Sequence, residues 1–471
     1  MNKFQKIILI LLVSISILPK LYKINIGIAD RHSHRQADTA SVTKNLLNGS
    51  GKFFIPTYHD LSDVQSGQEN PKGYRMVELP IYNQLTVIFH NLVQNFYPTA
   101  TVAFSSRATS IIISTISILL IFGLSYQYTN LFLPSILVTL IFAFLPFNIY
   151  YSSSVLPEPL AVMFMLLSLF LFRKKMFLSA ISLSLSILIK PYTAPLTLPF
   201  LVIFGLDKLK KQGTKVIFKS FIFALISIVP FIIWRFWIKN YPQGIPASTW
   251  LFNGNGIRLK PAWFRWLFFE RISNMILGSY LLIPFFLGFT YRKNRAQKLV
   301  FSLFSGVILY FLVIATGNVQ HDYYQTLIIP SLSISVGFGL FYILNYTFKN
   351  NFIATFAIII LVGFGLSFSW YQVKDFYNIN NPVIFKAGGW VDKNLETNAK
   401  VIAPYTGDTA FLYQTNRSGW PTEIYKFENI IKDTTDPIYL VSVNFDTYTN
   451  SMIQKFPTIY KSDKFIVLKI K

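Results

Sequence analysis

Long apolar runs, separated by short polar segments, dominate this sequence. A helix needs about 20 residues to cross the hydrocarbon layer of a membrane, and runs of about this length recur along most of the chain. The two runs that meet at Lys190-Pro191 are short, so they form either two spans, one kinked element or a re-entrant pair. We predict eleven spans, at residues 5–22, 102–126, 131–148, 156–172, 176–189, 192–206, 216–237, 275–290, 299–315, 323–346 and 352–370.

The composition agrees with a membrane protein. Charged residues make up 13% of the 471 residues, whereas soluble domains carry about 25%. The formal net charge is +23, and most of the excess lies among the predicted spans, where it suits anionic lipid rather than nucleic acid. Membrane lipids are therefore expected partners and nucleic acid is not. The absence of cysteine excludes disulfides and thiolate chemistry.

Basic clusters in the short loops predict the orientation of the chain. Lys and Arg are retained on the cytoplasmic side of a membrane, and such clusters occur at Arg173-Lys174-Lys175, 207–215, 292–298 and Lys349. We expect these loops and the N-terminus to be cytoplasmic, so that an odd number of spans leaves the C-terminus outside. No A-x-A pattern follows the first span, which predicts an uncleaved anchor. The expected location is the cell (plasma or inner) membrane.

The tail has the composition of a soluble domain. Residues 400–403 and 437–443 resemble buried strands, and residues 465–470 alternate as an edge strand does. We expect the Gly388-Gly389-Trp390 segment to begin or end a helix. The predicted fold class is therefore an α-helical polytopic membrane domain, residues 1–370, followed by a small extracytoplasmic α/β domain, residues 371–471.

The first outer loop, residues 24–101, contains most of the polar chemistry. The run 30–40 reads DRHSHRQADTA. Residues 38–47 and 80–93 are predicted as amphipathic helices that lie along the membrane interface. Asp38 and Glu78 would then lie at the membrane surface, where a lipid head group is found.

Each polar residue also has a structural interpretation. Asp38 would cap the helix that follows it. Glu158 opens a span and suits the positive end of its dipole. His321 and Asp322 precede another span as a cap would, and Lys190 would snorkel to the head groups. The functional interpretation gains weight because all of these residues are predicted on one face of the membrane.

Seven segments of the membrane part together resemble a known group of enzymes. The group is that of the bacterial GT-C fold glycosyltransferases related to protein O-mannosyltransferases and aminoarabinose lipid A transferases. The tail AGGWVDKNLETNAKVIAPYTGDTAFLYQTNRSGW is similar to the outer domain of some relatives. The order and spacing of the segments are more specific than any single motif. The seven segments are HSHRQADTA, KNLLNGSGKFFIP, ELPIYN, SRATSIIISTISILLIFGL, YYSSSVLPEPLAVMF, KPYTAPLTLPF and HDYYQTLIIPSLSI.

The resemblance implies transfer of a sugar from a polyprenyl-phosphate carrier to a lipid, glycan or protein acceptor on the outer face. In the family an acidic residue early in the first outer loop acts on the acceptor. Many relatives have Asp-Glu where this chain has Arg35-Gln36, so Asp38 is the first candidate for the base and Asp30 or Glu78 are the alternatives. The predicted substrate-binding residues are His34, Arg35, Gln36, Tyr82, Arg107, Glu158, Lys190, Tyr192, His321, Asp322 and Tyr324.

The chemistry supports these residue types independently. An acceptor hydroxyl must lose a proton as it attacks the anomeric carbon, which requires a carboxylate within reach. The leaving group is a phosphate, which is already a stable anion. The reaction therefore does not need the second carboxylic acid that glycosidases use. Cations such as Lys190 and Arg107 would stabilise that phosphate. The sequence predicts neither a metal site nor a cofactor.

Two other functions fit a chain of this kind. A transporter or flippase of lipid-linked sugars would show charged residues within spans and paired halves around a midplane site, and neither is clear here. A scaffold or receptor would need fewer spans than the eleven predicted. Both rank below a transferase.

Overall fold

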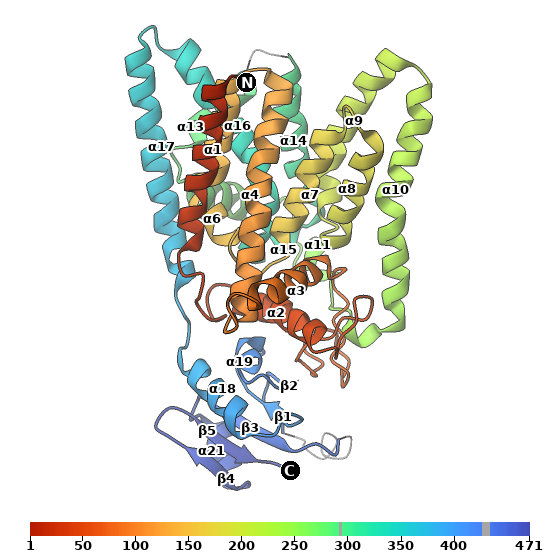
Figure 1. Ribbon diagram of the computed structural model, residues 1–471, viewed down its shortest axis with the longest axis vertical. Helices are drawn as coiled ribbons and strands as arrows, with labels where there is room; N and C mark the ends of the chain where they lie inside the picture. Colours follow the sequence, from red (N-terminus) through yellow and green to blue (C-terminus); the bar gives the residue numbers. More distant parts are fainter. Residues whose placement is uncertain (292–293, 426–433) are drawn as a thin grey trace. The chain divides into compact units, whose positions relative to one another are not determined.

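The described residues form two compact units, each assembled from three segments of the chain. A computed structural model describes residues 1–291, 294–425 and 434–471, and Figure 1 traces it in sequence order. The predicted basic residues Arg292 and Lys293 lie outside the described residues. Unit 1 comprises Met1–Ile24, Arg107–Phe236 and Ser248–Asp375, and unit 2 comprises Asn25–Ser106, Trp237–Ala247 and Phe376–Lys471.

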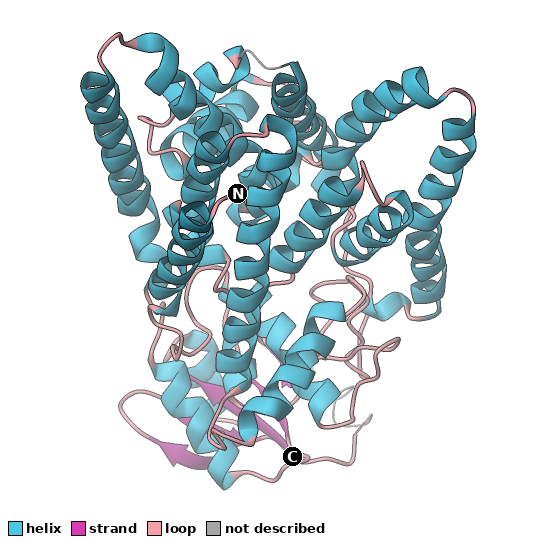
Figure 2. Ribbon diagram, turned by 45° about the horizontal axis from the view of Figure 1, so that its top comes forward, coloured by secondary structure: helices cyan, strands magenta, loops and turns pink. Residues whose placement is uncertain are grey.

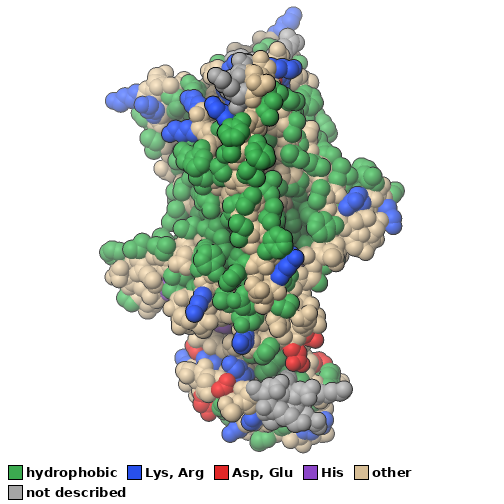
Figure 3. All heavy atoms as spheres, turned by 90° about the vertical axis from the view of Figure 1, so that its right-hand side faces the viewer, with side chains coloured by type: hydrophobic (Ala, Val, Ile, Leu, Met, Phe, Trp, Pro, Cys, Tyr) green, Lys and Arg blue, Asp and Glu red, His purple; other side chains and the backbone are tan. Residues whose placement is uncertain are grey.

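Unit 1 is a bundle of apolar helices. Within the described ranges, six helical segments are long and apolar enough to cross a membrane, and three shorter apolar helices accompany them. Figure 3 shows a broad hydrophobic band over the helices, with Lys and Arg side chains gathered at its upper end. The long segments are Lys3–Leu21, Val102–Thr129, Val216–Asn240, Asn294–Val313, Asp322–Thr347 and Asn351–Tyr377, and the short ones are α5 (Phe132–Phe144), α7 (Glu158–Leu171) and α8 (Met176–Ile189).

The long segments and the regions between them are made up of individually labelled helical elements. The segments are α1 (Lys3–Ile17), η1 (Leu18–Leu21), α4 (Val102–Thr129), α6 (Pro146–Tyr151), α9 (Thr193–Gln212), α10 (Lys215–Trp237), α11 (Trp250–Asn253), α12 (Pro261–Phe264), η4 (Arg265–Ile276), α13 (Leu282–Leu287), η5 (Gly288–Thr290), α14 (Asn294–Val313), α15 (Ala315–Gln320), η6 (Asp322–Ile328), α16 (Ile329–Tyr342), η7 (Ile343–Thr347), α17 (Asn351–Val373) and η8 (Lys374–Tyr377). The predicted multi-pass helical membrane part is confirmed, while the count of eleven spans stays a prediction. Helices α8 and α9 are separate elements on either side of Lys190-Pro191.

Two predicted spans are not continuous helices. The helix predicted at 131–148 breaks at Leu145, whose extended backbone precedes Pro146, because the residue before a proline avoids the helical region. The helix predicted at 275–290 breaks at Gly278 and Ser279, which have φ of +52° and +58°. These positive values follow the end of η4 at Ile276, and the next helix, α13, begins at Leu282.

Glycines let α16 form the core of unit 1. In the most apolar stretch of Asp322–Thr347, the segment that contains α16, 83% of the residues are buried. The corresponding share is 17% in each of the segments that contain α10 and α17. A Cβ at Gly339 would lie 1.6 Å from the carbonyl oxygen of Pro284, and one at Gly337 would lie 2.5 Å from the Cα of Val138. Small residues therefore allow α13 and α5 to approach the backbone of α16, as in other membrane bundles.

Unit 2 contains a five-stranded mixed sheet with the order β2-β1-β3-β5-β4, drawn in magenta in Figure 2. Strand β1 is parallel to β2 and β3, while β5 is antiparallel to β3 and β4. The strands are β1 (Lys400–Ile402), β2 (Gly419–Trp420), β3 (Ile438–Ser442), β4 (Thr458–Lys461) and β5 (Ile466–Lys469), and the helices are α2 (Ser33–Leu47), α3 (Ile81–Gln94), η2 (Ile238–Asn240), η3 (Pro242–Gly244), α18 (Val383–Asn394), α19 (Thr409–Gln414) and α21 (Thr447–Ile453).

Two predictions for the tail are wrong. Residues 465–470 were expected at an edge, but β5 pairs on both sides and three of its four residues are buried. Gly388 was expected at a helix end, but it lies inside α18. A Cβ at Gly388 would lie 2.5 Å from the backbone of Gln414, so this glycine serves the close packing of α19 against α18.

The first loop and the tail pack together within unit 2. Helix α19 packs against α2, and the Gln414 side chain donates to the carbonyl of Ile28 at 3.0 Å. Beside β2, the amide of Gly419 donates to the carbonyl of His59 at 2.9 Å, and the amide of Leu61 donates to Gly419 at 2.8 Å. The loop thereby extends the sheet by a short parallel bridge.

Candidate functional site

Asp38 lies inside a helix rather than at its start. Helix α2 begins at Ser33 because His32, with φ of +55°, adopts a left-handed backbone that ends the preceding loop. Asp38 is therefore in the second turn, so the interpretation of Asp38 as a helix cap is wrong. The end of the helix is as predicted, since α2 stops at Leu47 before Gly49, whose φ is +74°.

Three side chains hold the Asp38 carboxylate. Arg75 Nη2 lies 2.8 Å from Oδ2, and the Gln65 amide donates to the same oxygen at 3.0 Å. The Thr409 hydroxyl donates to Oδ1 at 2.7 Å. The Asp38 side chain is 2% exposed, so its charge is compensated by an ion pair and hydrogen bonds rather than by water.

A second acidic group lies behind Arg75. The guanidinium of Arg75 is 5.0 Å from the ring centroid of Tyr58, and the Tyr58 hydroxyl donates to Asp60 at 3.3 Å. Burial raises the pKa of Asp60 to about 6, although hydrogen bonds from Ser62 oppose the shift. Burial also lowers the pKa of the adjacent His59 to about 3. Asp60 was not among the candidate site residues predicted from the sequence.

The remaining predicted residues of the first loop form their own pairs. Arg35 pairs with Glu78, and the Gln36 amide donates to Asp30 at 2.8 Å. Arg35 does not pair with Asp38, whose ion-pair partner is Arg75. Burial, the largest influence, lowers the pKa of His34, although the charges of Asp38 and Asp408 oppose the shift.

The Arg35–Glu78 and Asp38–Arg75 pairs line one small cavity. Its volume is about 10 Å³, room for roughly one water molecule. Arg35, Asp38 and Glu78 are thus brought together, whereas Asp30 and Gln36 form a separate contact. Tyr82, on α3, is buried and donates to the carbonyl of Ser106 at 2.8 Å.

Unit 1 has a buried ion pair of its own. Lys190 Nζ lies 2.7 Å from Glu158 Oε1, and the two side chains are 7% and 0% exposed. Glu158 begins α7, as predicted, and Lys190 follows the last residue of α8. The structural interpretation that Lys190 snorkels to the head groups is wrong, because its ammonium is buried against Glu158. Ionisable groups buried among membrane helices are costly and usually functional.

Aromatic rings surround this pair. Lys190 Nζ is 6.0 Å from the ring centroid of Tyr324, and the Tyr192 ring is 5.3 Å from the Tyr324 ring. His321 lies 5.8 Å from Tyr324, centroid to centroid. The structure therefore brings together Glu158, Lys190, Tyr192, His321 and Tyr324, five of the predicted substrate-binding residues.

Asp322 takes part in a second buried contact. Its carboxylate accepts a hydrogen bond from Tyr151 and lies 3.6 Å from Arg271 Nη1. Arg271 also donates to the carbonyl of Val319 at 3.1 Å. Arg107, in α4, is buried at 3% exposure.

Comparisons with known proteins identify the fold. No family model matches the chain, and no curated protein matches it in sequence. The crystal structure of ArnT from Cupriavidus metallidurans bound to undecaprenyl phosphate is similar, with a TM-score of 0.66 and 10% identity, and the apo structure of the same protein has a TM-score of 0.61 and 10% identity. Each comparison covers 98% of this chain and 97% of that chain.

This chain has an ArnT-like fold. The predicted GT-C group is thereby supported at the level of fold, and at 10% identity the likeness extends no further.

Sequence reasoning missed several partners of these residues. Gln65 and Thr409 carry no local motif, and Thr409 is 371 positions from Asp38. Arg271 lies in η4, which was expected to be mostly loop. A signal did exist for Glu158 and Lys190. Glu158 begins α7 and Lys190 follows the end of α8, and these two consecutive helices have 14 residues each, so an antiparallel pair brings both residues to the same end.

Proposed function

We propose that the protein is an integral-membrane glycosyltransferase that moves a sugar from a polyprenyl-phosphate-linked donor to a lipid, glycan or protein acceptor on the outer face. The observation that carries this proposal is the likeness to ArnT bound to undecaprenyl phosphate, which covers 98% of this chain. Buried ion pairs in both units add support, because paired charges at such positions commonly serve binding or catalysis.

The proposed reaction needs an anion-binding group and a base. The acceptor oxygen forms a bond to the anomeric carbon as the bond from that carbon to the phosphate oxygen breaks, and the polyprenyl phosphate leaves as an anion. We assign Lys190 to the donor phosphate, with Tyr192 and Tyr324 beside the sugar. Glu158 would hold the Lys190 ammonium in position while no donor is bound.

Asp38 is the proposed base that takes the acceptor proton. Its hydrogen bonds from Thr409 and Gln65 fix the orientation of the carboxylate, and Arg75 forms an ion pair with Oδ2. Each carboxylate oxygen can accept two hydrogen bonds, so an acceptor hydroxyl is proposed to approach Oδ1 beside the Thr409 hydroxyl. Glu78 and Asp30 are the alternatives, each already paired, with Arg35 and Gln36 respectively.

Donor-dependent sugar transfer by the purified full-length protein tests the function. Incubation with a polyprenyl-phosphate sugar and an extract of acceptors should yield a glycosylated product and free polyprenyl phosphate. A flippase would instead move the donor across sealed vesicles without consuming it, and a scaffold would do neither. Absence of transfer across a panel of pentose and hexose donors would reject the proposal.

The proposed orientation has its own test. Since the chain has no cysteine, single cysteines report accessibility without background. Lys174 and Lys349 are exposed in predicted cytoplasmic loops, while Gln68 and Lys455 are exposed in unit 2. In sealed cells an impermeant thiol reagent should label positions 68 and 455 and not 174 or 349. Labelling of position 349 before lysis would reverse the orientation.

A further inference from the structure

A basic pocket opens among α8, α9 and α10 in unit 1, at the start of α8, whereas Lys190 follows the last residue of this helix. Its volume is about 490 Å³, within the range of small-molecule sites. Four cationic residues line it: Arg173 and Lys174 from the loop before α8, Lys208 from α9 and Lys219 from α10. None of the twelve described lining residues is acidic.

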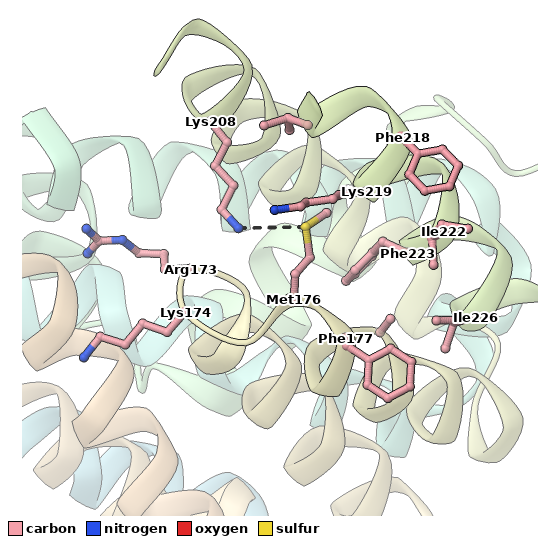
Figure 4. A pocket seen from close by; sticks show the side chains of 12 residues that line it. Arg173, Lys174, Met176, Phe177, Lys208, Phe218, Lys219, Ile222, Phe223 and Ile226 are labelled. Carbon is pink, nitrogen blue, oxygen red and sulfur yellow. Dashed lines mark hydrogen bonds between the residues drawn. The ribbon is translucent and has the colours of Figure 1, made fainter. Parts of the chain in front are cut away.

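Two of the cations converge. In Figure 4 the ammonium groups of Lys208 and Lys219 point toward one another beside Met176, while Arg173 and Lys174 extend to the other side. Lys208 donates to the carbonyl of Phe172, and its ammonium lies 4.4 Å from the centroid of the Phe172 ring. These contacts hold the lysine inward instead of leaving it in water.

The nearby acid does not offset this charge. Asp207 precedes Lys208 in α9, but both of its carboxylate oxygens accept from Lys298, at 2.8 and 2.9 Å. Lys208 and Lys219 are close enough to repel one another electrostatically. Like charges near one another disfavour the charged forms, and an anion bound between the two ammonium groups would relieve this repulsion.

Apolar side chains also line the pocket, which adjoins a larger groove. Phe177, Phe218 and Phe223 line the basic pocket. A second cavity of about 780 Å³ shares Met176, Val216 and Phe223 with it and is lined mostly by apolar side chains of α8, α9, α10 and α14. A ligand that fits both must carry an anionic head and a hydrocarbon tail.

We propose that this pocket binds an anionic glycerophospholipid, with its phosphate between Lys208 and Lys219 and an acyl chain in the adjoining groove. Basic pockets between membrane helices on the cytoplasmic side bind anionic lipid head groups elsewhere. A topogenic signal alone requires only that basic residues occur in the loop. It does not require two lysines from different helices whose ammonium groups point toward one another beside an apolar groove.

Lipid titration of the purified full-length protein tests the site. Binding of phosphatidylglycerol in neutral detergent, followed by native mass spectrometry, should weaken about fivefold for Lys208→Met and again for Lys219→Met. Lys349→Met is the matched control, because it removes an exposed charge from another predicted cytoplasmic loop. Lys208→Arg keeps the charge and should retain binding, which separates loss of the anion site from misfolding.

Competitors decide the identity of the ligand. Phosphatidylcholine and inorganic phosphate should compete weakly, the first because its head group is neutral overall and the second because it has no tail. Equal loss of binding in Lys349→Met, or inorganic phosphate competing as well as phosphatidylglycerol, would overturn the proposal. So would displacement by polyprenyl phosphate at lower concentration than by phosphatidylglycerol.

Discussion

The two units arrange their buried charges in different ways. In unit 1, Glu158 and Lys190 come from the facing ends of two consecutive apolar helices, and apolar packing of α7 on α8 sets their separation. In unit 2, Asp38 takes its partners from a loop at Gln65 and Arg75 and from the tail at Thr409. The first arrangement depends on helix packing and the second on a network of polar contacts.

This difference predicts how each region responds to substitution. An ion pair set by helix packing should tolerate joint replacement by uncharged groups, because the helices remain in place. A polar network should not, because its members position one another. The predictions below test this contrast, from the largest expected effect to the smallest.

The largest effect is expected at the pair in unit 1. Lys190→Met or Glu158→Gln leaves one buried charge without its partner, which costs about 3–5 kcal/mol, whereas the double variant should recover most of that loss. Thermal unfolding in detergent measures the stability, and titration with undecaprenyl phosphate measures donor-site binding. If Lys190 is the phosphate ligand, binding falls in Lys190→Met and in the double variant but persists in Glu158→Gln. Full binding by the double variant would make the pair purely structural.

The next effect concerns Asp38. Asp38→Asn should lower turnover at least about a hundredfold, since a general base contributes that much or more. It also leaves Arg75 without its ionic partner, so the double variant Asp38→Asn/Arg75→Gln is the informative comparison. Activity that stays low in the double variant supports a base, and activity that returns shows that Asp38 only neutralised Arg75. Thr409→Val is the control, because it removes one hydrogen bond and keeps the carboxylate.

A smaller effect is expected where α18 meets α19. Gly388→Ala would place a Cβ 2.5 Å from the backbone of Gln414, and such overpacking costs about 1–3 kcal/mol. Gly389→Ala is the matched control, since its Cβ would meet nothing within 4 Å and alanine favours the helix by up to about 1 kcal/mol. The two neighbouring substitutions should therefore shift the melting temperature in opposite directions. A shift of the same sign would contradict the close packing of α19.

The smallest effect concerns pH. With a pKa of about 6 in the fold, Asp60 keeps its proton where the unfolded chain has lost it, so it adds stability as pH falls from about 6 to 4. His59, with a pKa of about 3, remains neutral where the unfolded chain is protonated, so it removes stability over much of the same interval. The two contributions oppose each other, and the wild-type dependence should be weak.

Substitution separates these two contributions. Asp60→Asn removes the stabilising one, so the melting temperature of this variant should fall more steeply than that of the wild type between pH 6 and 4. Asp63→Asn, at an exposed position nearby, should follow the wild type. A parallel pH profile for Asp60→Asn would argue against a shifted carboxyl at this position.

The membrane part was the most predictable from the sequence. Apolar runs located the helices, since α7, α8, α10 and α17 begin within two residues of their predicted starts. Local conformation at single residues was less predictable. Helix α2 begins at Ser33, after the left-handed backbone of His32, and not at residue 38 as predicted. The positive φ values of Gly278 and Ser279 interrupt the helix that the apolar run at 275–290 predicted. Such choices depend on tertiary contacts that periodicity does not record.

The candidate site was predicted in its residue types but not in its pairing. Asp38, Lys190 and Glu158 were chosen from the sequence, but Arg75, Gln65 and Thr409 were not predicted as the partners of Asp38. Two consecutive antiparallel helices of equal length place the start of the first beside the end of the second, and this would have indicated the Glu158–Lys190 pair. Thr409 had no comparable signal, because its contact with Asp38 depends on how the tail packs against the first loop.

The hydrogen bond from Thr409 to Asp38 has a consequence for how the protein is made. Its two residues are 371 positions apart, and ribosomes add about 5–20 residues per second. The segment around residue 38 is therefore synthesised roughly 20–75 s before the threonine that completes its hydrogen bonding. During that interval Asp38 lacks its hydrogen bond from Thr409, so the environment of this carboxylate is completed only when the segment around residue 409 has been synthesised.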